Sequence, residues 1–310
     1  MSKNTSTKRG RVRTPPQDPE TPVRFAELLK LRGHAQATQE EYLRFVRKLS
    51  ARTNGDPSTL DEAGLRAHLL KLKEEHHYSP SSMRTAVAAM RAFFHLHLGH
   101  DWRLFDLVRA ASERKLPTVL TPAEVARLFA VVREPRFRTL FRLIYACGLR
   151  LGEALTLEVG DIRNGCVHLS RTKGNKERYV PLPDAMLAEL RAFWKTHRNP
   201  RWLFPSVGRG WRDKPESVAK LARVDEPMGH GSVQHCLQLA RAAAQLPETT
   251  TPHTLRHSYA THLLDEGVSI RLISAYLGHT SLETTMIYLH LTAVNEAHAR
   301  AAIARILPPL

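Results

Sequence analysis

A histidine and an arginine stand three residues apart at the start of a predicted helix. In residues 251–267, TPHTLRHSYATHLLDEG, Thr251 can cap the helix and Pro252 suits its first position. His253 and Arg256 then lie in the first turn and a half, where unpaired backbone N–H groups and the helix dipole favour negative charge. A basic pair at this end of a helix indicates a bound anion such as a phosphate. A histidine held only by local packing is the alternative.

Tyr288 is a second candidate for chemistry. Residues 277–291, LGHTSLETTMIYLHL, predict a helix that begins with a capping box of Thr280 and Glu283. The predicted apolar stripe consists of Leu282, Met286 and Leu289. At about 100° per residue, Tyr288 lies roughly 120° from Leu282, so we expect it away from the core. Such a tyrosine is usually a surface residue, and by itself it indicates no function, nor does His279 before the cap.

The charge balance indicates a polyanionic partner. The 310 residues include 46 Lys and Arg against 30 Asp and Glu, which gives a formal net charge of +16 spread along the whole chain. Such an excess favours nucleic acid as the partner. The alternative is a soluble protein that is merely basic. With 42% hydrophobic and 25% charged residues, the composition is that of an ordinary globular protein.

The three cysteines and the N-terminal segment bear on the compartment. Cys147, Cys166 and Cys236 are far apart and odd in number, which argues against a disulfide framework or a zinc ribbon. The first 20 residues contain five basic and two acidic side chains and no apolar segment typical of a signal peptide. We therefore expect a cytoplasmic, nucleoid-associated protein without membrane spans. Residues 1–20 are predicted to be a flexible basic arm, either resting on phosphates or inert.

Residues 21–108 predict a small helical domain. Thr21 and Ser79, each followed by proline, indicate the starts of the first and fourth helices. A capping box of Thr38 and Glu41 indicates the start of the second. The third helix is marked by an apolar stripe of Leu65, Leu69 and Leu72.

Residues 109–119 break this periodicity with charges and a proline, so we expect a linker there and a second domain over 120–310. A capping box of Thr121 and Glu124 opens the second domain. Residues 166–172 and 177–182 predict two strands of a hairpin joined at 173–176. Helices are expected at 183–195 and 232–244, whereas 200–231 show no clear pattern. The fold class is therefore mainly α in two domains, an N-terminal helical bundle and an α+β domain with a small antiparallel hairpin or sheet.

Four basic residues outside the helix starts are candidate phosphate contacts. Arg84 and Arg91 share a face of the helix that follows Ser79, and Lys176 and Arg178 belong to the hairpin. A solvated basic face is the alternative for both pairs.

Taken together, these segments resemble the tyrosine recombinase, or phage integrase, family. Residues 146–155, ACGLRLGEAL, resemble its first-arginine motif with the accompanying acid, and 171–182, RTKGNKERYVPL, its hairpin-lysine motif. Residues 253–264, HTLRHSYATHLL, are similar to its His-x-x-Arg motif, and 277–290, LGHTSLETTMIYLH, to its closing motif. The resemblance places the family's site residues, in order, at Arg150, Glu153, Lys173, His253, Arg256, His279 and Tyr288. It also implies a core-binding domain followed by a catalytic domain.

The resemblance implies DNA strand exchange through a covalent 3′-phosphotyrosyl intermediate. Tyr288 would attack a phosphodiester, with His253 as a plausible proton acceptor because its ordinary pKa lies near the working pH. Arg150 and Arg256 would clamp the non-bridging oxygens, a task that suits the permanently charged, planar guanidinium. Lys173 would protonate the departing 5′ oxygen.

In the same comparison His279 would donate a hydrogen bond to the phosphate. Glu153 would orient a basic partner, although an ordinary first-turn carboxylate is equally consistent with its position. The reaction conserves the phosphodiester's energy, so it requires no ATP, and the resemblance implies no metal or other cofactor.

Three other functions compete with this interpretation. A non-catalytic DNA-binding regulator would explain the charge but not the ordered set of reactive residues. A type IB topoisomerase would share the chemistry but relax DNA as a monomer. A zinc enzyme is suggested by His253 and His257, four residues apart, but Thr254 stands where a zincin carries glutamate.

Strand exchange implies a homotetramer on two double-stranded DNA sites. Residues 293–310, AVNEAHARAAIARILPPL, predict an Ala-rich helix with an apolar end. It either docks on a neighbouring subunit, as in the family, or covers its own core. The sequence discloses neither the target site nor the outcome, whether integration, excision, inversion or dimer resolution.

Overall fold

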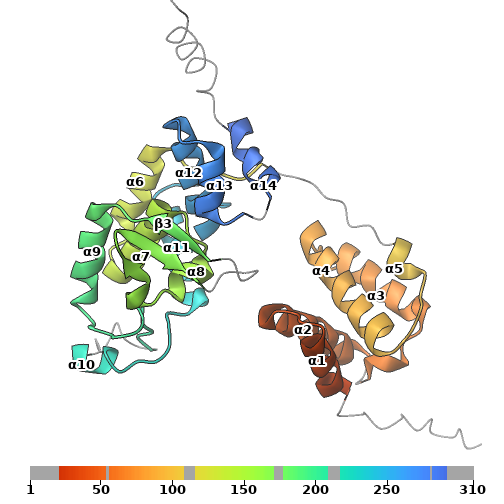
Figure 1. Cartoon of the computed structure of the whole chain (residues 1–310). Coiled ribbons are helices and arrows are strands. Elements are labelled where there is room, and N and C mark those ends of the chain that lie inside the picture. Colours follow the sequence, from red (N-terminus) through yellow and green to blue (C-terminus); the bar gives the residue numbers. More distant parts are fainter. Residues whose placement is uncertain are drawn as a thin grey trace, which may run out of the picture. The chain divides into compact units, whose positions relative to one another are not determined.

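The computed structural model describes residues 21–53, 56–107, 116–170, 177–208, 217–279 and 281–291. The chain divides into two compact units, residues 1–115 and 116–310 (Figure 1). The predicted basic arm, the C-terminal segment from 293, the turn 173–176 and residues 109–115 of the predicted linker lie outside the described residues. Within the described ranges, no helix is long and apolar enough to cross a membrane.

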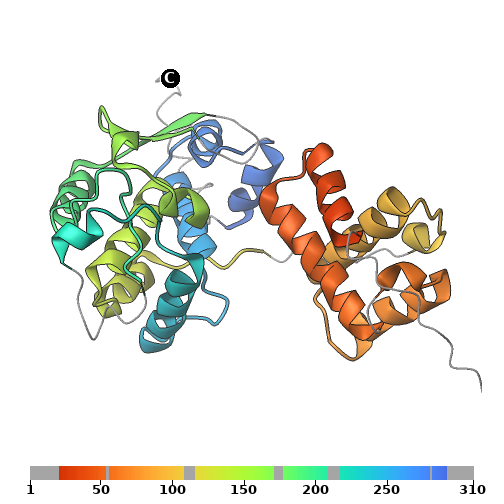
Figure 2. The same ribbon diagram turned by 90° about the horizontal axis from the view of Figure 1, so that it is seen from below.

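The first unit is a bundle of helices, coloured red to orange in Figure 2. Its helices are α1 (Thr21–Leu31), α2 (Gln36–Arg52), α3 (Glu62–Glu74), α4 (Pro80–Met90) and α5 (Leu104–Leu107). A π-helical segment, Arg91–His97, continues α4. The bundle packs around a core in which Phe25, Leu65 and Phe93 are fully buried. As predicted, Ser79 caps α4 by accepting a hydrogen bond from the backbone N–H of Ser82 at 3.2 Å.

The predicted start of the second helix at Thr38 is wrong. Helix α2 begins at Gln36, and the backbone N–H of Thr38 already donates to the carbonyl of Ala35 at 2.8 Å. The start is fixed two residues earlier because Gly33 ends α1 with a φ of 71° and the side chain of Gln39 donates to the carbonyl of His34 at 2.6 Å. A hydrogen bond across the turn therefore decides this start.

The second unit is mainly helical and carries a small sheet. Its helices are α6 (Pro122–Val131), α7 (Pro135–Cys147), α8 (Leu151–Leu155), α9 (Asp184–Trp194), α10 (Val218–Leu221), α11 (His230–Ala243), α12 (Pro252–Asp265), α13 (Ile270–Leu277) and α14 (Glu283–Met286). The strands are β1 (Ile162–Arg163), β2 (Cys166–Leu169) and β3 (Arg178–Pro181), antiparallel in the order β1-β2-β3. The mainly α fold with a small antiparallel sheet is thus confirmed.

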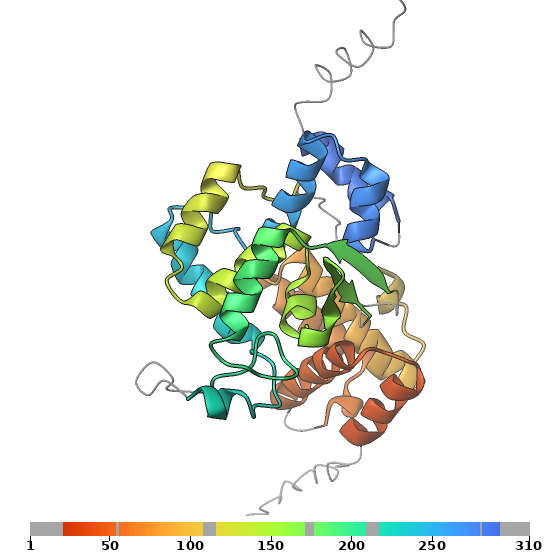
Figure 3. The same cartoon turned by 60° about the vertical axis from the view of Figure 1, so that its left-hand side comes forward.

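The register of the predicted hairpin places Leu169 opposite Arg178 and Val167 opposite Val180. In Figure 3 the green strands lie close to the blue helices α12, α13 and α14, and β3 contacts α13. Strand β1 has only two residues and was not predicted, because so short a strand leaves no period in the sequence. Residues 200–231, which showed no pattern, include α10. The buried side-chain amide of Asn199 fixes the position of this segment by donating to the carbonyls of Leu221 and Val224.

Two buried helices position the residues of interest. Helix α7 lies in the main core and packs against α12, and α12 also packs against α13 and the 3₁₀ segment Ile287–Leu291, called η4. Gly148 ends α7 and Gly278 ends α13, both in the left-handed conformation, with φ of 58° and 63°. Left-handed ends turn the chain sharply. The last carbonyls of a helix have no partner within the helix, so they can accept from other donors.

We expect Gly148→Ala to destabilise the chain more than Gly267→Ala. Both glycines have positive φ, which costs an alanine about 1–2 kcal/mol. A methyl group at Gly148 would also overlap the ring of Tyr259, whereas Gly267 faces open space. Overpacking of this kind costs roughly a further 1–3 kcal/mol. Thermal unfolding followed by circular dichroism measures the difference, and equal effects of the two substitutions would contradict the packing argument.

Candidate active site

Arg256 lies buried between the C-terminal ends of two helices. It projects from the second turn of α12, and its side chain is 4% exposed. Its Nη1 donates to the carbonyl of Gly148 at the end of α7, and its Nη2 donates to the carbonyl of Leu277 at the end of α13, both at 2.6 Å. Helix C-termini carry partial negative charge, so they suit a guanidinium. The two helix ends therefore fix the orientation of Arg256.

Arg150 is the N-cap residue of α8 and lies two residues after Gly148. Its Nη1 donates to Glu153 Oε1 at 2.8 Å, and its backbone N–H donates to Oε2 of the same carboxylate at 2.8 Å. Its Nη2 lies 3.5 Å from the carbonyl of Gly278. Gly278 directly follows Leu277, whose carbonyl accepts from Arg256. The side chain of Arg150 is 32% exposed, so this guanidinium is open to a ligand.

Glu153 joins the arginines through one carboxylate. Besides Arg150, it accepts two hydrogen bonds from Arg178, Nη1 to Oε1 at 3.0 Å and Nη2 to Oε2 at 2.7 Å. Its Oε2 lies 3.9 Å from Nη1 of Arg256. We call these four residues the arginine–glutamate cluster: Arg150, Glu153, Arg178 and Arg256. With three guanidiniums and one carboxylate, the cluster keeps an excess of positive charge, which suits a phosphate.

The pKa values reflect this arrangement. Burial by itself would raise the pKa of Glu153, but the hydrogen bonds and charges of Arg178 and Arg150 outweigh it and lower the pKa to about 2. Burial, followed by repulsion from Arg150, lowers the pKa of Arg256 to about 10. Both groups therefore remain charged at neutral pH.

Arg178 was expected among the DNA contacts, but the structure places it inside the cluster. Its side chain is 8% exposed, its Nε donates to the carbonyl of Tyr276 at 2.8 Å, and its two terminal nitrogens bind Glu153. Little of the guanidinium is left for a phosphate. The sequence suggested an exposed hairpin residue because no local pattern shows that β3 contacts α13.

His279 follows α13 and contacts Arg256. Arg256 Nη2 lies 3.2 Å from its Nε2, and its Nδ1 lies 2.8 Å from the hydroxyl oxygen of the buried Thr285. Because a guanidinium is only a donor, Nε2 must accept, and Nδ1 then carries the proton that Thr285 receives. Burial and the charges of Arg256 and Arg150 lower the pKa of His279 to about 4, so it is neutral near pH 7. Both ring nitrogens are thus occupied, and donation to a phosphate requires that one bond open.

His253 lies exposed in the first turn of α12 and has no hydrogen-bond partner among the described residues. Desolvation, followed by the charges of Arg256 and Arg150, lowers its pKa. Its ring is therefore neutral at neutral pH and able to accept a proton. As predicted, Thr251 begins this helix, with its backbone N–H donating to the hydroxyl of Thr254 at 3.0 Å.

The prediction that Tyr288 lies away from the core is wrong. It is 2% exposed and packs with Tyr259, Ile273 and Leu277. The predicted stripe is instead exposed, with Leu282 at 40% and Met286 at 48%. The 100° rule fails because α14 has only four residues and continues as the 3₁₀ segment η4, whose turn contains about three residues.

The phenol hydroxyl of Tyr288 lies 2.9 Å from Nδ1 of His257. Burial raises the pKa of Tyr288, while the charges of Arg256 and Arg150 oppose this rise. Sequence reasoning considered His257 only as a zinc partner of His253. Its one sequence signal is its position, directly after Arg256 and one helical turn after His253. In the part of the chain that is described, no group of three or more His, Cys, Asp or Glu residues is placed to hold a metal ion.

The remaining candidates do not join this site. Lys173 and Lys176 lie outside the described residues. Arg84 is exposed on α4. Arg91 is bound within its own unit, because its Nη2 donates to the carbonyl of Phe105 at 2.6 Å and to Asp106 at 3.1 Å. Arg84 is therefore the more available of the two for a phosphate.

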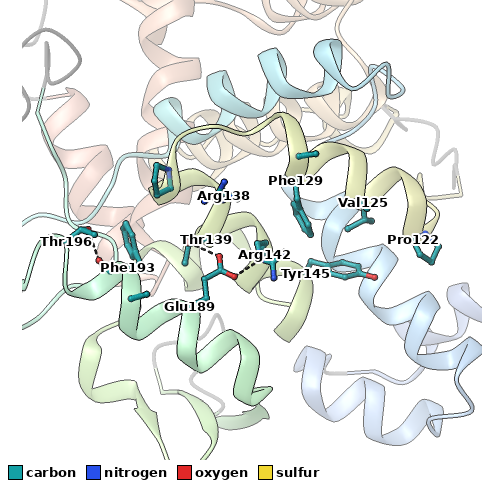
Figure 4. A pocket seen from close by; sticks show the side chains of 14 residues that line it. Pro122, Val125, Phe129, Arg138, Thr139, Arg142, Tyr145, Glu189, Phe193 and Thr196 are labelled. Atoms are coloured by element: carbon teal, nitrogen blue, oxygen red, sulfur yellow. Dashed lines mark hydrogen bonds and ion pairs between the residues drawn. The ribbon is translucent and has the colours of Figure 1, made fainter.

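An open groove of about 780 Å³ lies elsewhere on the second unit, between α6, α7 and α9 (Figure 4). Phe129, Tyr145 and Phe193 supply much of its apolar lining. On its wall Glu189 accepts from the hydroxyl of Thr139 at 3.0 Å and from Nε of Arg142 at 2.6 Å. None of the sequence-predicted site residues lines this groove.

Comparison with known proteins shows the family of this chain. Residues 118–294 match the model of the phage integrase family, and residues 23–104 match the phage integrase N-terminal SAM-like domain. A putative integrase/recombinase, y4qK, of Sinorhizobium fredii is 32% identical over 293 residues, which cover 93% of this chain and 90% of that protein. The tyrosine recombinase XerA of Thermococcus kodakarensis is 33% identical over 283 residues, covering 90% and 92%.

Among solved structures, a lambda integrase fragment, a dimer bound to a core site, has the same fold. The TM-score is 0.65 at 20% identity, over 87% of this chain and 94% of the other. The family model and the relatives above 30% identity identify the chain as an integrase-type recombinase. The chain belongs to the phage integrase, or tyrosine recombinase, family and is a tyrosine site-specific recombinase.

We expect Glu153→Gln to destabilise the second unit by roughly 3–5 kcal/mol at pH 7, because it leaves buried guanidiniums without a counter-charge. The pKa of Glu153 falls from 4.5 to about 2 on folding, so its stabilisation is complete above pH 4.5 and is lost as the pH falls toward 2. Urea unfolding followed by hydrogen–deuterium exchange of α12 measures the effect.

The variant should lose less stability than the wild type between pH 4.5 and 2, since its site lacks the titrating carboxylate. Glu266→Gln, at an exposed position of the same unit, is the matched control. If the Glu153 variant lost as much unfolding free energy as the wild type between pH 4.5 and 2, the assignment of this pKa to Glu153 would be contradicted.

Proposed function

We propose that this recombinase cleaves and rejoins double-stranded DNA through a covalent 3′-phosphotyrosyl intermediate on Tyr288. One observation carries the proposal: Arg150 and Arg256 lie against the carboxylate of Glu153, and His279 contacts Arg256. The charges of both arginines also favour a lower pKa of the Tyr288 phenol. A non-catalytic regulator would not require this combination of a cationic pocket and a phenol.

In the proposed reaction, the guanidiniums of Arg150 and Arg256 bind the two non-bridging phosphate oxygens. Their charge grows in the transition state, so each guanidinium binds more strongly there than in the ground state. Loss of one such donor typically costs on the order of 10² to 10³ in rate. Glu153 and Arg178 are positioning residues. The carboxylate of Glu153 has no donor for a phosphate, and the buried guanidinium of Arg178 is bound to Glu153 and to the carbonyl of Tyr276.

Tyr288 forms the O–P bond as the P–O5′ bond breaks. The phenol proton passes to His253, which is neutral and exposed at the head of α12. Lys173 gives a proton to the leaving 5′ oxygen. The energy of the phosphodiester stays in the tyrosyl ester, so the reverse attack by a 5′ hydroxyl reseals the strand and no cofactor takes part.

We further propose that four protomers act on two sites, because strand exchange needs four cleavages. A lambda integrase tetramer bound to a Holliday junction is among the structures of similar fold, with a TM-score of 0.64 at 20% identity. A type IB topoisomerase would instead relax DNA as a monomer. Residues 293–310 are a candidate for contacts between protomers.

We expect Tyr288→Phe to abolish covalent adduct formation. The wild type, incubated with nicked DNA that carries its site, should give a protein–DNA band on a denaturing gel. The nick releases the short fragment that ends in the 5′ hydroxyl, so this hydroxyl cannot reseal the strand. Tyr179→Phe is the matched control, since Tyr179 is 55% exposed on β3. An adduct that still forms in the Tyr288 variant would contradict the assignment of Tyr288 as the nucleophile. Relaxation of supercoiled DNA by isolated monomers would favour the type IB topoisomerase.

We expect Lys173→Ala to slow cleavage by on the order of 10² to 10⁴, the usual range for loss of a general acid. A substrate with sulfur in place of the 5′-bridging oxygen should restore most of the rate, because a thiolate leaves without a proton. Single-turnover adduct kinetics measure both rates. If the sulfur substrate gives no recovery, Lys173 is not the acid. The matched control is Lys176→Ala, three residues along the same segment.

A further inference from the structure

The buried resting position of Tyr288 depends on a polar contact that the proposed reaction does not use. Its hydroxyl lies 2.9 Å from Nδ1 of His257, with the ring centroids 5.7 Å apart. The rest of the side chain packs against Tyr259, Ile273 and Leu277. A buried phenol needs a hydrogen-bond partner, and among the described residues His257 is the partner of this one.

The contact has a defined direction. Burial, followed by the charges of His253 and Arg256, lowers the pKa of His257 to about 4, so its ring is neutral at pH 7. Among the described residues His257 is the partner of the phenol, so only the tautomer with an unprotonated Nδ1 satisfies the hydroxyl hydrogen of Tyr288. Tyr288 therefore rests as a protonated donor to Nδ1. So weakly basic an imidazole is a poor general base, which separates the role of His257 from that of His253.

The helix α12 places both histidines. His253 and His257 are one turn apart, but His253 is exposed at the helix head, whereas His257 is half-buried and turned toward η4. The segment that carries Tyr288 is short and irregular, with α14 of four residues and η4 of five. Such a segment has few backbone hydrogen bonds of its own, so side-chain contacts govern where it rests.

We propose that His257 is a positioning residue that holds Tyr288 in a buried resting state, and that cleavage begins when this hydrogen bond opens and the η4 segment releases the phenol toward the arginine–glutamate cluster. The role of Tyr288 as nucleophile rests on the proposed function. The hydrogen bond itself does not. His257 thereby limits attack by chains that are not engaged with a DNA site.

Two variants separate the hydrogen bond from the packing. His257→Leu fills a similar space with an apolar side chain and removes the acceptor, whereas His257→Asn keeps a short acceptor near the position of Nδ1. Tetranitromethane nitration of Tyr288, quantified by mass spectrometry against the exposed Tyr179, reports release of the phenol without any DNA. In the Leu variant we expect about tenfold faster nitration, the factor for one net hydrogen bond, and in the Asn variant a rate near the wild type.

The initial rate of adduct formation on nicked site DNA should follow the nitration rate across the variants. We expect this initial burst to be several-fold faster in the Leu variant, because the buried resting state no longer competes with attack. Equal nitration in all three proteins overturns the proposal. A burst that falls 100-fold in both variants, with nitration unchanged, also overturns it and makes His257 part of the reacting machinery. If the wild type forms no adduct but nitration follows the expected order, the proposed function fails while this inference stands.

A measurement that leaves His257 in place tests the same contact if His257→Leu does not fold. The ¹⁵N NMR signal of His257 Nδ1 should have the shift of a hydrogen-bonded acceptor in the wild type and should move in Tyr288→Phe, which keeps the ring and removes the hydroxyl. An identical shift in both proteins overturns the proposal.

Discussion

The buried carboxylate of Glu153 is the interaction on which the rest of the site depends. It binds Arg150 and Arg178 directly and lies 3.9 Å from Arg256, so one negative charge keeps three guanidiniums close together. The carbonyl ends of α7 and α13 supply the remaining acceptors. Without these partners, mutual repulsion and desolvation would push the arginines apart. The cluster is therefore rigid and still cationic, which is the condition for binding an anion whose charge grows during reaction.

The site combines this rigid part with a part that is held by fewer contacts. The arginines are held by helices of the main core, whereas Tyr288 lies on a short segment whose burial rests on a small cluster around Tyr259 and on His257. His279 connects the two parts, because one ring nitrogen contacts Arg256 and the other contacts Thr285 in α14. A phosphate that competes for Arg256 or His279 would thus weaken the contacts that hold the tyrosine segment. In the proposed reaction, phosphate binding and the release of Tyr288 would be coupled through this imidazole.

Local signals predicted the elements well where the determining contacts are local. The N-cap residues and prolines that begin α4 and α6 act within one turn. Strand β3 alternates between buried and exposed residues, a local signal of a strand. The start of α2 was misplaced because a hydrogen bond from Gln39 to His34 decided it. The exposed stripe of α14 was misassigned because a period of 3.6 was applied to a segment that changes to 3₁₀ geometry.

The sequence by itself determined the family, the mainly helical fold and the identities of the residues that carry charge and a phenol, since these depend on residue type, order and spacing. Only the tertiary structure decided what those side chains contact. It placed Arg178 inside the cluster rather than on the surface, gave both nitrogens of His279 partners, and paired Tyr288 with His257. The physical reason is that these contacts, apart from the one between His279 and Thr285, join residues 23 to 31 positions apart. Which side chains are buried, and which charged groups they meet, depends on how the helices pack. No local sequence pattern contains this information.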